Sequence, residues 1–166
     1  AALALNALNS YSGPGIWTIG GCDYHGSSQQ ESDTKALEIG IAIGRSIELA
    51  HRLAKPLVFQ ILTDGGCSTQ EGTRSMQSDA GDKSMTVLGR YRPEGAPAQR
   101  QNVQVGSYTQ GKGANRDTLI GADADRVAYA VLANYLNVSG RMGAVFDYLP
   151  QGLFTAEEVD SLVIFD

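Results

Sequence analysis

The chain has 166 residues, of which 42% are hydrophobic and 19% are charged. These proportions suit one packed domain and exclude global disorder. Thirteen Lys and Arg residues against 18 Asp and Glu residues give a net charge of −5, which argues against binding to nucleic-acid backbones. Apolar stretches are interrupted well before the roughly 20 residues that a membrane-spanning helix needs, so we expect no membrane span.

The chain opens on an apolar, uncapped stretch. Residues 1–9 predict a helix that starts without a cap, as if at a cut or processed end. We therefore expect either one α/β domain over residues 1–166 or the C-terminal part of a larger domain that is incomplete at its N-terminus. Residues 16–19 then predict a strand, which the pair Gly20-Gly21 ends.

A strand, a helix and a second strand are expected in succession. Residues 34–54 have apolar side chains at helical spacing, and residues 57–62 form a short apolar run typical of a strand buried on both faces. Together with residues 16–19 they predict a βαβ unit. The fold class that we expect is α/β, with a mainly parallel sheet, flanking helices, and the ends after Ile19 and Leu62 at one edge.

The remaining elements are expected in the second half of the chain. Residues 63–83 predict a long loop rich in Gly, Ser, Thr and Asp, and the strands at 85–88 and 102–105 would form a hairpin. A helix over 123–136 is expected to present one apolar face, and Thr155 with Glu158 matches a capping box at a helix start. An apolar segment, 162–165, closes the chain. The apolar face of the helix over 123–136 comprises Val127, Val131, Leu132 and Tyr135.

Polar side chains follow the first two expected strands. Asp23 and His25 come after the first strand, and Asp64 comes after the second. Ligands of open α/β sheets bind beyond the carboxyl ends of strands, so these side chains could bind a divalent metal or share proton transfer. The alternative is that Asp23 and Asp64 cap the turns that follow them.

Cys22 and Cys67 are the only cysteines, and each lies close to one of these strand ends. A disulfide between them would close a loop of about 45 residues, contribute roughly 3–4 kcal/mol, and imply an oxidising compartment. One alternative is a zinc site that the two cysteines complete with His25 and an Asp, and the other is two free, buried thiols.

No catalytic residue can be assigned from the sequence. Ser27 and Ser68 are possible nucleophiles, but neither lies in a Gly-x-Ser-x-Gly elbow. His51 lies in the expected long helix, where we expect it to face solvent.

Three segments carry a resemblance to a known family: Gly20-Gly21-Cys22-Asp23-Tyr24-His25, Thr63-Asp64-Gly65-Gly66 and Ser78-Asp79-Ala80-Gly81. Over roughly residues 1–137 the chain resembles a bacterial family of uncharacterised proteins related to sulfatases and alkaline phosphatases. The resemblance implies an alkaline-phosphatase-like parallel sheet and hydrolysis of phosphate or sulfate esters with bound metal. It also implies that zinc, calcium or magnesium would bind Asp23, His25, Asp64 and Asp79.

The chain departs from that family at Ala80, which stands where a metal-binding histidine is expected, and it lacks the family's nucleophile segment. A missing ligand severely weakens a metal site. We therefore expect a non-catalytic structural or assembly protein, without a cofactor, that forms a homo-oligomer or part of a larger assembly. Its expected location is extracytoplasmic: periplasmic, secreted or particle-associated.

Two other functions stay open on the sequence. A metal-dependent hydrolase of phosphate or sulfate esters would use the four ligands named above. A carbohydrate or small-ligand binding module would use the aromatic side chains of Trp17, Tyr24 and Tyr108.

Overall fold

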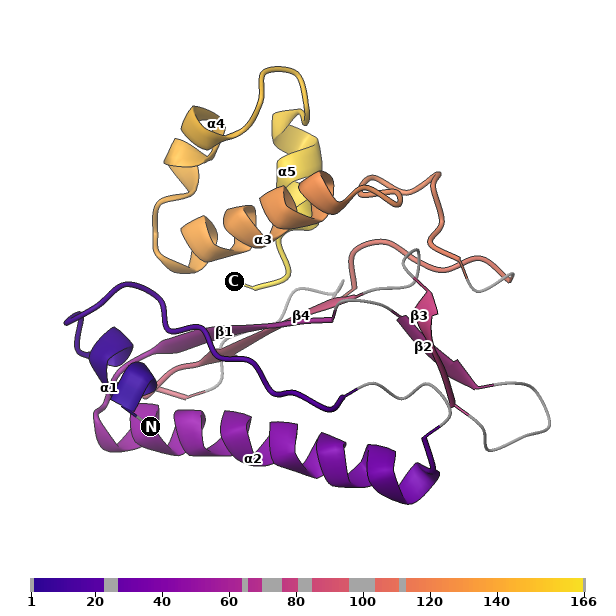
Figure 1. Ribbon diagram of the computed structural model, residues 1–166. Coiled ribbons are helices and arrows are strands. Elements are labelled where there is room, and N and C mark those ends of the chain that lie inside the picture. The colour runs from indigo at the N-terminus through magenta and orange to yellow at the C-terminus, as the bar shows by residue number, and fades with distance from the viewer. Residues whose placement is uncertain are drawn as a thin grey trace. The chain divides into compact units, whose positions relative to one another are not determined.

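A computed structural model describes residues 2–22, 27–63, 66–69, 76–80, 85–95, 104–110 and 113–165. In 66–69 and 76–80 it describes the backbone alone. The chain divides into two compact units, Ala1–Ala96 and Pro97–Asp166. Figure 1 labels the elements of both units, and each unit is described here by itself.

The first unit contains two helices and four strands within its described residues. They are α1 (Ala2–Leu8), α2 (Gln29–Arg52), β1 (Leu57–Leu62), β2 (Gly66–Thr69), β3 (Met76–Ala80) and β4 (Thr86–Tyr91). The helices expected at the start of the chain and before residue 54 are confirmed, as is the strand at 57–62.

Helix α2 begins earlier than the apolar spacing predicted, because a capping box stabilises a polar first turn. The Glu31 amide donates to the Ser28 hydroxyl at 3.3 Å, and the Ser28 amide donates to the Glu31 carboxylate at 2.8 Å. These reciprocal bonds satisfy amides that have no partner within the helix. The helix therefore begins at Gln29 and not near Thr34.

The described strands pair only in antiparallel fashion. β1 pairs with β4, from Leu57 opposite Tyr91 to Leu62 opposite Thr86. β2 pairs with β3, from Gly66 opposite Ala80 to Thr69 opposite Met76, with a register shift between them. The prediction of a mainly parallel, alkaline-phosphatase-like sheet is therefore wrong.

The physical reason is that the described residues between β1 and β4 contain the strands β2 and β3 and no helix that could serve as a parallel crossover. Antiparallel strands can be joined by a local connection, whereas a parallel pair needs a crossover over a helix. The predicted strand at 16–19 is wrong, since these residues form no strand, and residues 63–83, expected as a loop, contain β2 and β3. The predicted strand at 85–88 belongs to β4. The expected hairpin with 102–105 is not formed by the described residues, since 104 and 105 form no strand; residues 102 and 103 lie outside the described residues.

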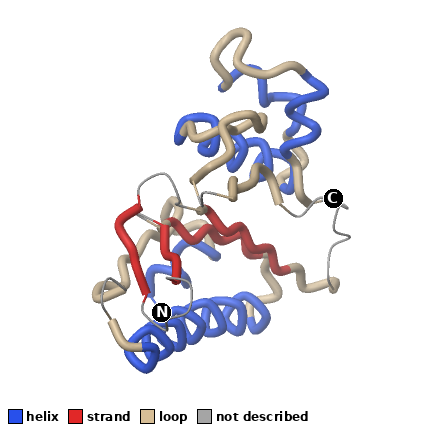
Figure 2. The backbone as a smooth tube through the Cα atoms, turned by 90° about the vertical axis from the view of Figure 1, so that its right-hand side faces the viewer, coloured by secondary structure: helices blue, strands red, loops and turns tan. Residues whose placement is uncertain are grey.

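Helix α2 contacts the β1–β4 ribbon at its C-terminal end. The His51 Nδ1 atom lies 2.9 Å from the Tyr91 hydroxyl, and the two rings meet edge to face with centroids 6.3 Å apart. Figures 1 and 2 both show α2 running beside this ribbon. Within the first unit, α2 thus forms one layer and the β1–β4 ribbon forms a second layer beside it.

The second unit is helical in its described part (Figure 2). It contains α3 (Ala124–Val138), the 3-10 helix η2 (Met142–Ala144), α4 (Val145–Tyr148) and α5 (Ala156–Leu162). The predicted helix after Asp123 and the predicted capping box of Thr155 with Glu158 are both confirmed.

The buried core of the second unit lies between these helices. Tyr135, expected on the apolar face of α3, is 55% exposed, whereas Asn134 is 3% exposed. The buried face of α3 is therefore rotated from the predicted one. The buried side chains that form the core are Ala130, Ala133, Leu136, Val145, Leu149, Phe154, Val159 and Leu162.

Among the residues that the structure describes, no helix is long and apolar enough to cross a membrane.

Candidate functional site

The expected metal site falls largely where the structure gives no description. Asp23, His25 and Asp64 lie outside the described residues, and Asp79 belongs to β3 with only its backbone described. Within the described part of the chain, no three His, Cys, Asp or Glu side chains are grouped to hold a metal ion. The metal-ligand set thus stays a prediction.

The strand pairing gives partial information about the backbone around Asp79. Ala80 pairs with Gly66, so the end of β3 that carries Asp79 lies beside the start of β2. The structure reaches this arrangement through an antiparallel hairpin, not through the parallel sheet edge that the sequence predicted. This antiparallel register places the backbone of Gly66 in β2 opposite that of Ala80 in β3.

Cys22 is a free thiol in the structure, and it is partly buried. Its Sγ atom donates a weak hydrogen bond to the Ile19 carbonyl oxygen at 3.4 Å. The Cys67 side chain lies outside the description, although its backbone belongs to β2. The Cys22–Cys67 disulfide therefore also stays a prediction.

The aromatic ligand site expected from Trp17, Tyr24 and Tyr108 stays a prediction. Trp17 and Tyr108 are 46% and 43% exposed, but they belong to different units. Tyr24 lies outside the described residues.

A hollow of about 630 Å³ lies at the N-terminus of α3. Asp123 caps this helix, since its carboxylate accepts from the Asp125 amide at 2.9 Å and the Arg126 amide at 3.3 Å. The Arg126 guanidinium donates to the Leu119 carbonyl oxygen at 2.9 Å and lies over the Phe154 ring, 5.2 Å from its centroid. The Asp123 and Arg126 side chains that line this hollow thus make contacts that stabilise the start of α3, and these contacts give them a structural role.

Among the described residues the first unit exposes ten large apolar side chains, and the second unit exposes four, which are Tyr108, Tyr135, Phe146 and Tyr148. Ile16 is 84% exposed, Leu37 is 63% exposed and Leu62 is 71% exposed. Scattered apolar residues on a surface are normal, whereas a contiguous apolar patch marks an interaction surface. Among the described residues of this unit, the exposed large apolar side chains are Leu3, Leu5, Tyr11, Ile16, Trp17, Leu37, Ile41, Leu62, Met85 and Val87.

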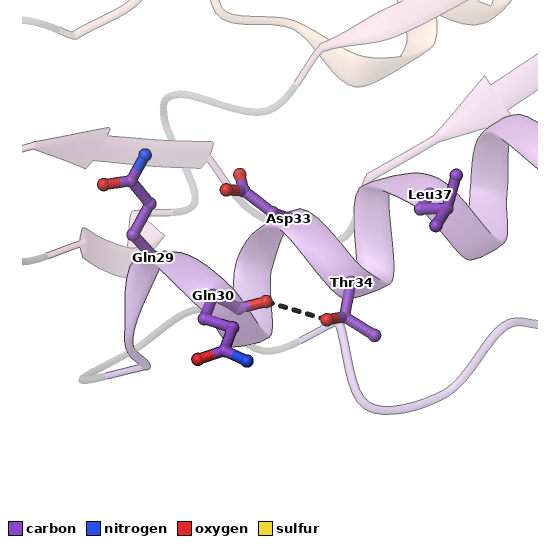
Figure 3. A pocket seen from close by; sticks show the side chains of 5 residues that line it. All are labelled: Gln29, Gln30, Asp33, Thr34 and Leu37. Atoms are coloured by element: carbon purple, nitrogen blue, oxygen red, sulfur yellow. Dashed lines mark hydrogen bonds between the residues drawn. The ribbon is translucent and has the colours of Figure 1, made fainter.

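A second hollow, of about 470 Å³, lies beside the first turns of α2. Figure 3 shows five side chains that line it, with Asp33 and Leu37 on the same side of the helix. The Thr34 hydroxyl donates to the Gln30 carbonyl oxygen at 2.8 Å, as the dashed line in Figure 3 marks. The Asp33 side chain is exposed. Sequence reasoning missed this surface, although Leu37 and Ile41 stand four residues apart among polar neighbours.

Comparisons with known proteins place no relative beside this chain. No protein-family model, no curated protein and no solved structure matches it. The resemblance to proteins related to sulfatases and alkaline phosphatases therefore gains no support from these comparisons.

Proposed function

We propose that this chain is a non-catalytic structural component that assembles with further copies of itself through its first unit. The observation that carries the proposal is the contrast in burial between the two units. Of the described residues in the first unit, only Ser32 and Ala50 are buried. The second unit has a contiguous buried cluster around Leu136, Val159 and Leu162.

A unit built in this way gains little stability from its own core. A two-stranded ribbon is marginal in water unless it packs against further structure, because it buries little apolar area. Each strand of the β1–β4 ribbon has one partner among the described strands. The outer backbone groups of such strands can pair with another chain. Contact with further copies would cover the exposed apolar side chains.

The alternative hydrolase function loses its structural rationale. Because the described strands pair antiparallel, the alkaline-phosphatase-like fold is no longer a reason to expect ester hydrolysis. The ligands that such an enzyme would need are Asp23, His25, Asp64 and Asp79.

The test combines sizing with elemental analysis of one natively purified sample of the whole chain. We expect a stable oligomer without stoichiometric metal. A monomer at the concentrations used for purification would overturn the assembly function. Stoichiometric zinc, calcium or magnesium that is lost in the Asp23→Ala and His25→Ala variants would instead favour the metal-dependent hydrolase.

A further inference from the structure

Helix α2 has two unlike sides. One side is turned toward the rest of its unit and is half-buried to buried at Ile39, Ile43 and Ala50. The other side is exposed at Asp33, Leu37, Gly40, Ile41, Gly44 and Arg45, which we call the α2 stripe. A helix of 24 residues exposes such a stripe over several turns.

The centre of the stripe is apolar. Leu37 and Ile41 are 63% and 42% exposed, and their spacing of four residues places them on neighbouring turns of one face. A Cβ atom added at Gly40 or at Gly44 would meet no atom within 4 Å. The backbone of another helix can therefore approach this side of α2 closely.

The two ends of the stripe carry opposite charges. Asp33 lies on the N-terminal side of the apolar pair and Arg45 on the C-terminal side. Among the described residues neither forms an ion pair, whereas the neighbouring charges are paired. Those neighbouring pairs are Lys35 with Glu38 at 2.9 Å and Arg52 with Glu48 at 2.7 Å.

We propose that the α2 stripe binds the same stripe of a second copy of this chain, with the two helices antiparallel. A two-fold axis at position 39 brings Asp33 opposite the partner's Arg45 and Leu37 opposite the partner's Ile41. Both pairs then occur twice, because a two-fold interface uses the same patch on each copy.

Charge decides the direction of the pairing. In a parallel pair, Asp33 would face the partner's Asp33 and Arg45 would face the partner's Arg45, which places like charges together. In the antiparallel pair both contacts join opposite charges. The hollow beside Asp33 and Leu37, about 470 Å³ in volume, offers room for a side chain of the partner (Figure 3). Electrostatic complementarity of this kind sets the register of an interface.

This contact rests on the proposed assembly function and names the surface that carries it. The test exchanges the two charges in the whole chain. Asp33→Arg and Arg45→Asp each replace two attractive contacts by two repulsive ones, and the double variant Asp33→Arg/Arg45→Asp restores the attraction with the signs reversed. Arg141→Asp makes the same charge change at an exposed position of the second unit and serves as the matched control.

The measurement is the dissociation constant of the assembly by analytical ultracentrifugation, with helicity followed by circular dichroism. We expect each single variant to weaken association about tenfold or more, and the double variant to recover most of that loss. The Arg141→Asp variant should associate like the wild type. Wild-type helicity in all variants would show that folding is unchanged.

The outcomes separate this inference from the function that it rests on. An oligomer that is equally stable in all variants would overturn the α2 contact and leave the assembly function standing. A double variant as weak as the single ones would also overturn the contact. A wild-type monomer would overturn both.

Discussion

The buried side chain of Asn134 in α3 holds the chain at Leu162, where α5 ends. Its amide nitrogen donates to the Leu162 carbonyl oxygen at 2.8 Å, and its amide oxygen accepts from the Ile164 amide at 2.8 Å. The same nitrogen also donates to the Ala130 carbonyl oxygen at 2.9 Å. One polar side chain thus satisfies the backbone where α5 gives way to the final extended segment.

We expect Asn134→Ala to lower the free energy of unfolding by about 2–4 kcal/mol, because it leaves buried backbone groups without partners. Asn137 makes a single bond of this kind, to the Phe165 carbonyl oxygen at 2.8 Å. Asn137→Ala should therefore cost less, about 1 kcal/mol. Urea unfolding of both variants gives the comparison, and an equal loss in the two would contradict the role assigned to Asn134.

The β1–β4 ribbon depends on a glycine opposite an aromatic ring. Gly89 pairs with Phe59, and a Cβ atom added at Gly89 would overlap the Phe59 ring. We expect Gly89→Ala to destabilise the first unit by about 1–3 kcal/mol, since the ring must leave its place over the strand. Thermal unfolding would measure this.

The matched background for that experiment is Phe59→Ala, in which the ring is absent. There, Gly89→Ala should be neutral or stabilising, because alanine restricts the unfolded chain more than glycine does. The same cost in both backgrounds would show that the clash with Phe59 is not the cause.

The two capping boxes make helix stability depend on pH. The Ser28 amide, with a smaller effect of the Ser28 hydroxyl, lowers the pKa of Glu31 below its ordinary value of 4.5, and Thr155 lowers the pKa of Glu158 in the same way. Since both pKa values are lower in the folded state, the stabilisation is present above about pH 4.5 and is lost as the pH falls through the folded values.

Between about pH 6 and pH 3 we expect the stability of the wild type to fall more steeply than that of Glu31→Gln or Glu158→Gln. Glu157→Gln removes a carboxylate next to the box of Glu158 but leaves the box intact, so it should keep most of the wild-type slope. Denaturant midpoints as a function of pH test this. Parallel slopes for the wild type and both box variants would rule out the capping carboxylates as the source.

The cysteine pair gives a prediction that a mass measurement decides. If Cys22 and Cys67 are bridged, the unreduced protein is lighter than the reduced protein by two hydrogen atoms. We expect this bridge after purification without reductant, with a stability gain of roughly 3–4 kcal/mol over the Cys22→Ser/Cys67→Ser variant. Two thiols that react with an alkylating agent in the native protein would show that the free thiol seen at Cys22 is the true state.

Several elements followed from the sequence because they depend on neighbours a few residues apart. The helical spacing through α2, the start of α3 at Asp123 and the capping box of Thr155 with Glu158 are all local patterns. Each involves side chains and amides within about one helical turn, so the residues themselves specify the geometry. The start of α2 at Gln29 is also a local pattern, because Ser28 and Glu31 form a capping box there. Apolar spacing alone does not indicate this start.

Tertiary structure decided what the sequence left ambiguous. An apolar run such as Leu57–Leu62 fits a parallel and an antiparallel sheet equally well, and only its partner β4 settles which one forms. In the same way, Asn134 can be buried in α3 because Leu162 and Ile164 supply hydrogen-bond partners for its side chain from 28 and 30 residues away. Pairing and burial are long-range properties, since they depend on which distant groups meet, and no local pattern of residues encodes that choice.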